Sequence, residues 1–226
     1  MPLSATYDSR RKIGVMQHSE TISIRERTRR AVRAEMTMLG QELIAARGYE
    51  QTTIDDIVAA VGMSKRTFFR YFTSKDDLVL SKYEFFGDQF VEVFAARASD
   101  EPIWESFRRA FDVVVGYFDD ATKVERILGM EKVIDGNPAL RAGELERVSR
   151  VQEEIAVLLR ERTGRHSPTD PGPGAITGAA FSCLLAAKAT WIVADPRPPF
   201  GELLDHAMAA LKPTEVGWGG SVEPSR

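Results

Sequence analysis

Apolar residues recur at intervals of three and four along most of this chain, which is the spacing of one face of an α-helix. The first such run covers residues 23–47, and its apolar positions are Val32, Met36, Leu39, Leu43 and Ala46. Gly48 follows the run and is a typical helix stop. We find no convincing period-two alternation of the kind that marks β-strands and no internal repeat, so the pattern predicts an all-α fold.

Applied to the whole sequence, the pattern predicts about nine helices. We expect them over residues 23–47, 53–60, 64–71, 74–97, 102–118, 122–134, 138–163, 175–194 and 199–211. Asn137-Pro138 suits the start of a helix, because asparagine caps it and proline fits the first turn. The stretch 164–174 contains three prolines and is expected to be a loop.

The two ends of the chain lack this periodicity. We expect a disordered N-terminal arm over residues 1–22 and a disordered tail, rich in glycine and proline, over residues 212–226. Between them we place a first domain at residues 23–75 and a second, larger helical domain at residues 76–211.

The composition is ordinary for a soluble globular protein, with 43% hydrophobic and 28% charged residues. The single Cys183 cannot form an internal disulfide, which suggests the reducing cytoplasm. The chain has no run of about 18 apolar residues, so no membrane span is predicted, and no secretory signal is seen.

The net charge of −3 is unevenly distributed along the chain, because residues 1–75 hold 13 Lys and Arg against 8 Asp and Glu. A basic first third suits a partner that carries phosphate, although chance scatter is the alternative.

The segment from Thr52 to Leu78 carries the most specific pattern in the chain. Two short helices, at about 53–60 and 64–71, are separated by Gly62, which permits the sharp turn that helices at about 90–120° require. This arrangement is a helix-turn-helix, whose second helix enters the DNA major groove. The sequence therefore predicts a protein that binds double-stranded DNA.

Polar and basic side chains are concentrated around the second short helix. Arg66 suits a guanine edge, because its guanidinium can form two hydrogen bonds there, and Thr67 suits a thymine methyl. Tyr71 and Lys75 are expected to contact phosphates. The predicted DNA-contacting residues are Thr53, Ser64, Lys65, Arg66, Thr67, Phe69, Arg70, Tyr71 and Lys75.

Other residues bear on the same interface. Phe68 and Phe72 lie four positions apart and are expected to face inward and anchor the second short helix. A basic stripe on the first helix is either a solvated face or a source of phosphate contacts, and it consists of Arg25, Arg29 and Arg33. The basic run at residues 10–12 leaves open whether the arm is only disordered or also contacts DNA.

The motif closely resembles the DNA-binding domain of TetR/AcrR-type transcriptional regulators over about residues 24–80. The matching elements are Gly48-Tyr49, Thr52-Thr53, Val61-Gly62-Met63-Ser64, Phe68-Phe69, Arg70-Tyr71-Phe72 and Ser74-Lys75-Asp76-Asp77-Leu78. Two positions depart from the family. Phe69 stands where a phosphate-binding tyrosine is common, a contact that Tyr71 can replace. Arg66 stands where glycine is frequent, and it either adds a base contact or restricts the operator.

The resemblance implies that the remaining helices bind a ligand and form a homodimer. Aromatic residues at helical spacing are either plain core or the lining of a pocket. The candidate pocket residues are Phe86, Phe90, Trp104, Phe107, Phe111, Met130, Phe181 and Trp191. The last two helices either form the dimer interface or pack only within the chain. The residues concerned are Ala175, Gly178, Ala179, Ala186, Ala187, Ala189, Phe200, Leu203, Leu204, Met208 and Leu211. A dimer would place two recognition helices on a palindromic operator.

The stretch Asn137-Pro138-Ala139-Leu140-Arg141 and the helix after it resemble the mycofactocin-type regulators of this family, a subgroup associated with long-chain acyl-CoA. The expected function is a homodimeric repressor that a small apolar ligand releases from its operator. Activation, and a helical interaction protein that no longer binds DNA, stay open as alternatives.

Catalysis is not predicted. His18, His166 and His206 have no metal-ligand spacing, and the chain lacks a phosphate loop and a Gly-x-Ser-x-Gly elbow. Cys183 lies in an apolar helix and is expected to belong to the core. We therefore expect no enzyme activity, no metal and no cofactor.

Overall fold

The computed structural model describes residues 24–167 and 169–212, and within them the secondary structure is helical, without a β-strand. The helices are α1 (Ile24–Arg47), α2 (Ile54–Val61), α3 (Lys65–Phe68), α4 (Lys75–Ala95), α5 (Ile103–Ala110), α6 (Asp112–Phe118), α7 (Val124–Asp135), α8 (Pro138–Thr163), α9 (Gly172–Val193) and α10 (Phe200–Ala210), with a short 3-10 turn η1 (Ala121–Lys123). The described fold agrees with the all-α prediction. Where one helix was predicted over 102–118, the structure has two, α5 and α6. The predicted arm, and the predicted tail beyond residue 212, lie outside the described residues.

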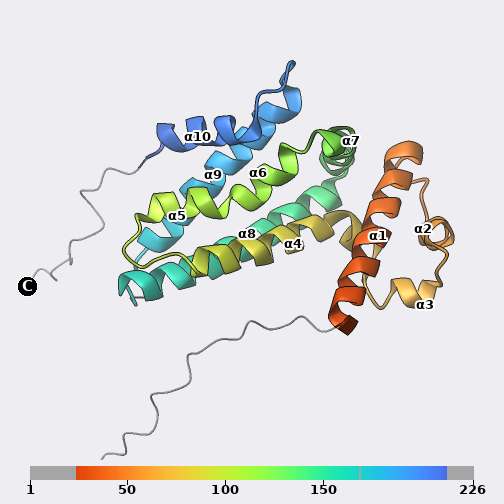
Figure 1. Cartoon of the computed structure of the whole chain (residues 1–226), viewed down its shortest axis with the longest axis horizontal. Coiled ribbons are helices and arrows are strands. Elements are labelled where there is room, and N and C mark those ends of the chain that lie inside the picture. The colour runs from red at the N-terminus through yellow and green to blue at the C-terminus, as the bar shows by residue number, and fades with distance from the viewer. Residues whose placement is uncertain (1–23, 168, 213–226) are drawn as a thin grey trace, which may run out of the picture.

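The helices form two groups (Figure 1). α1, α2 and α3 lie together at one end, and α4 runs from them into the other helices, where it packs against α8. α8 packs in turn against α9, and α9 packs against α10. α4 and α7 both contact α1, so these two helices connect the groups.

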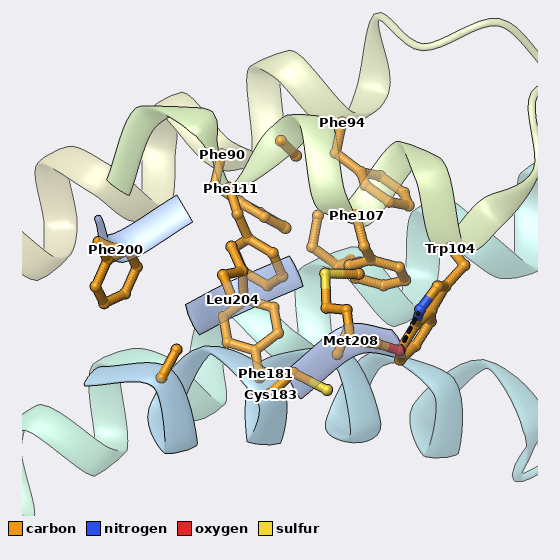
Figure 2. Packing of buried hydrophobic residues seen from close by; sticks show 14 of the residues in the cluster. Phe90, Phe94, Trp104, Phe107, Phe111, Phe181, Cys183, Phe200, Leu204 and Met208 are labelled. Carbon is orange, nitrogen blue, oxygen red and sulfur yellow. Dashed lines mark hydrogen bonds between the residues drawn. The ribbon is translucent and has the colours of Figure 1, made fainter. Parts of the chain in front are cut away.

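Each group has its own hydrophobic core. The N-terminal core contains Met36, Ile44, Ile57, Phe68 and Phe72 together with residues of α4 and α7. The C-terminal core is built largely from aromatic rings (Figure 2). α4 and α7 contribute to both cores, through Leu78, Phe90, Phe94, Ile127, Met130 and Ile134. A displacement of either helix would therefore disturb packing in both groups.

Capping residues define several helix ends, among them the predicted one at Asn137. Ser74 Oγ accepts a hydrogen bond from the Asp77 amide at 3.1 Å and begins α4. Asn137 Oδ1 accepts hydrogen bonds from two amides of the first turn of α8, at 3.0 and 3.2 Å. Gly164 ends α8 with a left-handed backbone, φ 67°, which favours glycine.

Two predicted boundaries are wrong by a few residues. α3 ends at Phe68 instead of residue 71, because the chain tightens into three-residue hydrogen-bonded turns there, with the Tyr71 amide bonded to the Phe68 carbonyl at 2.8 Å. α9 begins at Gly172, within the predicted loop, and Pro173 lies in its first turn. Proline is tolerated there because the first amides of a helix have no intrahelical partner.

By length and composition, α9 is the one described helix that could cross a membrane, a test that core helices of soluble proteins also pass. It is packed between α8 and α10, and Phe181, Ala187 and Trp191 are among its buried residues. These contacts are typical of a core helix.

Candidate DNA-binding surface and ligand cavity

Helix α2 begins with a capping box. Thr53 Oγ1 accepts a hydrogen bond from the Asp56 amide at 3.2 Å, and Asp56 Oδ2 accepts one from the Thr53 amide at 2.8 Å. The bonds from Thr53 lower the pKa of the Asp56 carboxyl, so a negative charge is kept at the positive end of the helix dipole. Thr53 is exposed and fixes the start of the helix.

Gly62 sets the geometry between α2 and α3. Its backbone is left-handed, φ 69°, and the next amide, of Met63, donates to the Val58 carbonyl at 2.8 Å. Ser64 then caps α3, because its Oγ accepts a hydrogen bond from the Thr67 amide at 3.2 Å. The predicted helix-turn-helix is present in the structure.

The exposed side of α3 presents two cations, and a third follows its end. Lys65 Nζ lies 2.8 Å from Asp55 Oδ2, so its charge is partly neutralised within the motif. Arg66 is exposed and, among residues 24–167 and 169–212, has no hydrogen-bond or ion-pair partner. Its planar set of N–H donors is therefore free to form a bidentate contact.

Arg70, Tyr71 and Phe69 extend this surface beyond the end of α3. The Arg70 guanidinium lies 5.0 Å from the centre of the Tyr71 ring, and its Nη2 donates to the Tyr71 hydroxyl at 3.2 Å. Phe69 is 54% exposed and can offer only an apolar contact. Phe68 and Phe72 are buried beneath this surface, which confirms their predicted anchoring role.

Two basic residues have internal partners that the sequence did not predict. Lys75 Nζ donates to the Tyr49 and Thr52 carbonyls at 2.6 and 2.9 Å and lies 3.9 Å from the centre of the Tyr49 ring. Its charge thus holds the turn before α2 against the start of α4, in place of the predicted free phosphate contact. Arg33 forms an ion pair with Glu84 at 2.8 Å and so ties α1 to α4.

The C-terminal group contains a cavity of about 80 Å³. Four of the eight predicted pocket residues line it, namely Phe86, Phe90, Phe111 and Phe181. The other apolar lining consists of Gly87, Val114, Tyr117, Phe118, Val148, Val151, Leu184, Leu185 and Phe200. The cavity is therefore mostly aromatic and aliphatic, with apolar side chains from α4, α6, α8, α9 and α10.

The other four predicted pocket residues do not line the cavity. Trp104 and Phe107 pack in the C-terminal core, where Trp104 Nε1 donates to the Met208 carbonyl at 3.1 Å (Figure 2). Trp191 is buried in the same core, and Met130 is buried in the N-terminal core. Helical spacing predicted that these side chains face inward. It did not predict which of the inward-facing side chains would line the cavity.

Part of the cavity lining is a buried charged cluster, which consists of Lys82, Tyr83, Glu131, Glu144 and Lys188. Lys82 Nζ lies 2.6 Å from Glu131 Oε1, and Lys188 Nζ lies 2.9 Å from Glu131 Oε2. Lys188 also lies 2.5 Å from Glu144 Oε1, which accepts a hydrogen bond from the Tyr83 hydroxyl at 2.6 Å. Sequence reasoning missed this cluster. The sequence did hold one indication of it. Glu131 and Glu144 occupy positions on α7 and α8 whose neighbours on the same helix face are apolar and buried.

We expect the free energy of unfolding to fall as the pH is lowered from about 5 towards 2. Burial alone would raise the pKa of Glu131, but Lys82 and Lys188 outweigh it and lower that pKa to about 2. Because the folded-state pKa is lowered, the ionised carboxylate stabilises the fold above its unfolded pKa, and this stability is lost as Glu131 protonates. Urea denaturation between pH 7 and 3 tests this point. Glu131→Gln should flatten the pH dependence, and equal slopes for variant and wild type would contradict it.

A second hollow, of about 270 Å³, adjoins the cavity. Glu144, Val148, Leu185 and Lys188 line both hollows. The second hollow also includes several exposed residues, among them Arg141, whose Nη1 lies 3.1 Å from Glu144 Oε2. Glu144 and Lys188 therefore border both the inner aromatic cavity and a more superficial hollow.

The predicted dimer residues behave differently on the two last helices. On α10, Phe200, Leu204 and Met208 are buried within this chain, whereas Leu203 is half-buried and Leu211, directly after the helix, is 52% exposed. The small residues of α9 that remain exposed or half-buried are Ala175, Gly178, Ala179, Ala186 and Ala189. The residues that remain available for the predicted dimer surface are therefore those on the outward face of α9, with Leu203 and Leu211 beside them.

The described residues contain no group of three or more His, Cys, Asp and Glu side chains arranged to hold a metal ion. Cys183 is buried, and burial raises the pKa of its thiol. It therefore belongs to the core, as predicted, and is not an activated nucleophile.

Comparison with known protein families covers both halves of the chain. Residues 40–81 match the family described as bacterial regulatory proteins, tetR family. Residues 101–215, about half of the chain, match the MftR C-terminal domain. The first match contains the helix-turn-helix and the second contains most of the cavity.

Two curated relatives and a solved structure agree with this assignment. TcmR of Streptomyces glaucescens, an HTH-type transcriptional regulator, is 30% identical over 146 residues, which are 62% of this chain and 64% of TcmR. MftR of Mycobacterium tuberculosis, named for the regulation of mycofactocin biosynthesis, is 26% identical over 151 residues, 67% of this chain and 75% of MftR. The TetR-family repressor FadR of Thermus thermophilus, solved with lauroyl-CoA, has the same fold, with a TM-score of 0.52 and 19% identity over 79% of this chain and 92% of that one. The alignment thus spans less than two thirds of the length of TcmR.

Proposed function

This chain belongs to the TetR family of bacterial transcriptional regulators, with a C-terminal domain of the MftR type, and on that basis we propose that it is a homodimeric, cytoplasmic repressor released from its operator by an apolar ligand. The observation that carries the DNA-binding part is the exposed surface of α3, where Arg66 has no partner within the described residues and Arg70 lies close by. In this proposal, Arg66 reads a base edge and Arg70 with Tyr71 contacts the backbone.

The aromatic cavity supports the ligand part of the proposal. Apart from the charged cluster, its lining is almost wholly apolar, which suits a molecule with an apolar body. A related fold, FadR of Thermus thermophilus, binds lauroyl-CoA, and we propose a long-chain acyl-CoA as the ligand class here as well.

The cavity is too small for such a ligand as it stands. Sites for drug-sized molecules have about 300–1,000 Å³, whereas this cavity has about 80 Å³. Ligand binding therefore requires the lining helices to move apart, and α4 is one of them. Because α4 also contributes to the N-terminal core, the ligand favours a different placement of the recognition helix and shifts the population away from the DNA-bound arrangement.

A gel-shift titration tests the function. The full-length protein and DNA from upstream of its own gene should form a complex that long-chain acyl-CoA dissociates. Tighter DNA binding on addition of the acyl-CoA would mean that the ligand favours the DNA-bound state. An unchanged complex would exclude this ligand class.

Ala186→Arg should separate the dimer into monomers. A long charged side chain on the exposed small-residue face of α9 would be buried unpaired at a close helix contact. We expect the dimer dissociation constant to rise at least about 100-fold, which corresponds to roughly 3 kcal/mol. Sedimentation velocity should show one 25.2 kDa chain in place of two.

The matched control is Ala95→Arg, which places the same side chain at an exposed position near the end of α4. This variant should remain dimeric. Dissociation of both variants, or of neither, would argue against α9 as the dimer surface.

A further inference from the structure

The charged cluster is placed where a ligand in the cavity would meet it. Lys82, Glu131 and Lys188 all line the inner cavity, and their side chains are no more than 11% exposed. An ionic cluster with so little solvent contact is costly to build, since each charge loses most of its hydration. It therefore calls for a role beyond filling space.

Both carboxylates of the cluster are already paired with cations. Both oxygens of Glu131 are occupied, one by each lysine, and Glu144 accepts from Lys188, Tyr83 and Arg141. A lysine ammonium has three N–H donors, and for Lys82 the described contacts are Glu131 and the face of the Tyr83 ring. Lys82 therefore retains N–H donors at the cavity wall, whereas each carboxylate is already paired with two cations. An acceptor oxygen would gain hydrogen bonds from Lys82, and a cation would meet Lys82, Lys188 and Arg141 around the two carboxylates.

The position of the cluster gives the guest its orientation. Glu144 and Lys188 line both the inner aromatic cavity and the superficial hollow. An apolar chain in the inner cavity would thus place its polar end beside Lys82 and Lys188, and any larger head group would extend into the hollow that Arg141 borders.

We propose that Lys82 and Lys188 form a polar subsite for the acceptor oxygen of an amphipathic ligand, a carboxylate or a thioester carbonyl, whose apolar chain fills the aromatic cavity. This inference rests on the proposed function only in that the cavity receives an apolar chain. The subsite also joins four helices, because its members lie on α4, α7, α8 and α9. An oxygen that draws Lys82 away from Glu131 weakens the buried link between α4 and α7, the two helices that also contact α1.

Isothermal titration calorimetry with three probes of equal chain length tests the subsite on the full-length protein. Laurate and lauroyl-CoA both carry the acceptor oxygen, and dodecylamine replaces it with a cation. Wild type should bind laurate, lauroyl-CoA or both at least about tenfold more tightly than dodecylamine. The tighter of the two oxygen probes identifies whether a free acid or a thioester is the better source. Equal binding of all three, preference for the amine, or no binding of either oxygen probe would overturn the proposal.

Lys82→Met removes the donors while it keeps the length of the side chain, and it should reduce oxygen-probe affinity at least tenfold without a matching effect on dodecylamine. Lys82→Arg should recover most of the affinity, which a purely packing role would not require. Lys132→Met, at an exposed position on α7, is the matched control and should bind as wild type. Unchanged affinity of Lys82→Met for the oxygen probes would overturn the proposed subsite.

Operator binding by the ligand-free variants, measured by gel shift, separates this result from the proposed function. Loss of operator binding would count against the DNA-binding role and not against the subsite.

Discussion

Replacing Arg66 and Arg70 together with alanine is expected to lower operator affinity at least about 30-fold. Arg66 is exposed without a partner in the described chain, and Arg70 is held beside Tyr71 just beyond the end of the same helix. A bidentate base contact contributes about 1–3 kcal/mol, and an arginine on phosphate adds a salt-dependent share. Fluorescence anisotropy with a labelled operator, at fixed salt, measures the loss.

The matched control is Arg150→Ala, which removes an exposed arginine from α8, far along the chain from the motif. It should bind operator as wild type does. Both proteins should keep the same oligomeric state by sedimentation, because neither site lies on the outward face of α9. Full operator affinity in the Arg66→Ala/Arg70→Ala variant would favour the alternative of a helical interaction protein that does not use α3 to bind DNA.

Phe107→Ala is expected to destabilise the C-terminal core by about 3–5 kcal/mol, the usual cost of removing a fully buried phenyl ring. The ring has no solvent exposure and lies within 4.8 to 6.4 Å, centre to centre, of the rings of Phe90, Phe94, Trp104 and Phe111. Its loss leaves a gap that these rings cannot fill without leaving their own contacts. Urea denaturation followed by circular dichroism measures the change.

Phe85→Ala is the control for this prediction, because Phe85 lies on α4 with 54% of its side chain exposed. It should cost no more than about 1 kcal/mol. Similar losses for the two variants would mean that Phe107 does not have the central packing role that its burial indicates.

The helix-turn-helix could be predicted in detail because its signals are local. Thr53, Gly62, Ser64 and Ser74 each act within three or four residues of their own position, through caps and a left-handed turn. The length of α3 was overestimated, since the tightening after Phe68 depends on how that ring packs against the rest of the motif.

The ligand cavity was predicted only in part, because cavities are a property of packing between helices. Phe111 and Phe107 both lie on inward-facing positions, yet only Phe111 borders the cavity.

The partners of Lys75 at the DNA-binding surface could not be predicted for the same reason. A basic residue after the motif suggests phosphate, and only the folded chain brings two carbonyls of the turn before α2 to its ammonium group.

The charged cluster was not predicted at all. Its ion pairs join residues 44 to 57 positions apart in the sequence, such as Lys188 with Glu144 and Glu131. A single charged residue within an apolar helix gives no indication of its partner until the helices are assembled.

DNase I footprinting of the DNA upstream of this protein's own gene tests most directly whether α3 of a dimeric TetR-family chain reads a palindromic operator. Wild-type protein should protect a palindrome whose half-sites lie about one helical turn, or a small multiple of it, apart. The Arg66→Ala/Arg70→Ala variant should leave that site unprotected at the same concentration. Equal protection by wild type and variant, or a footprint on a single half-site, would show that α3 of a dimer does not read a palindromic operator.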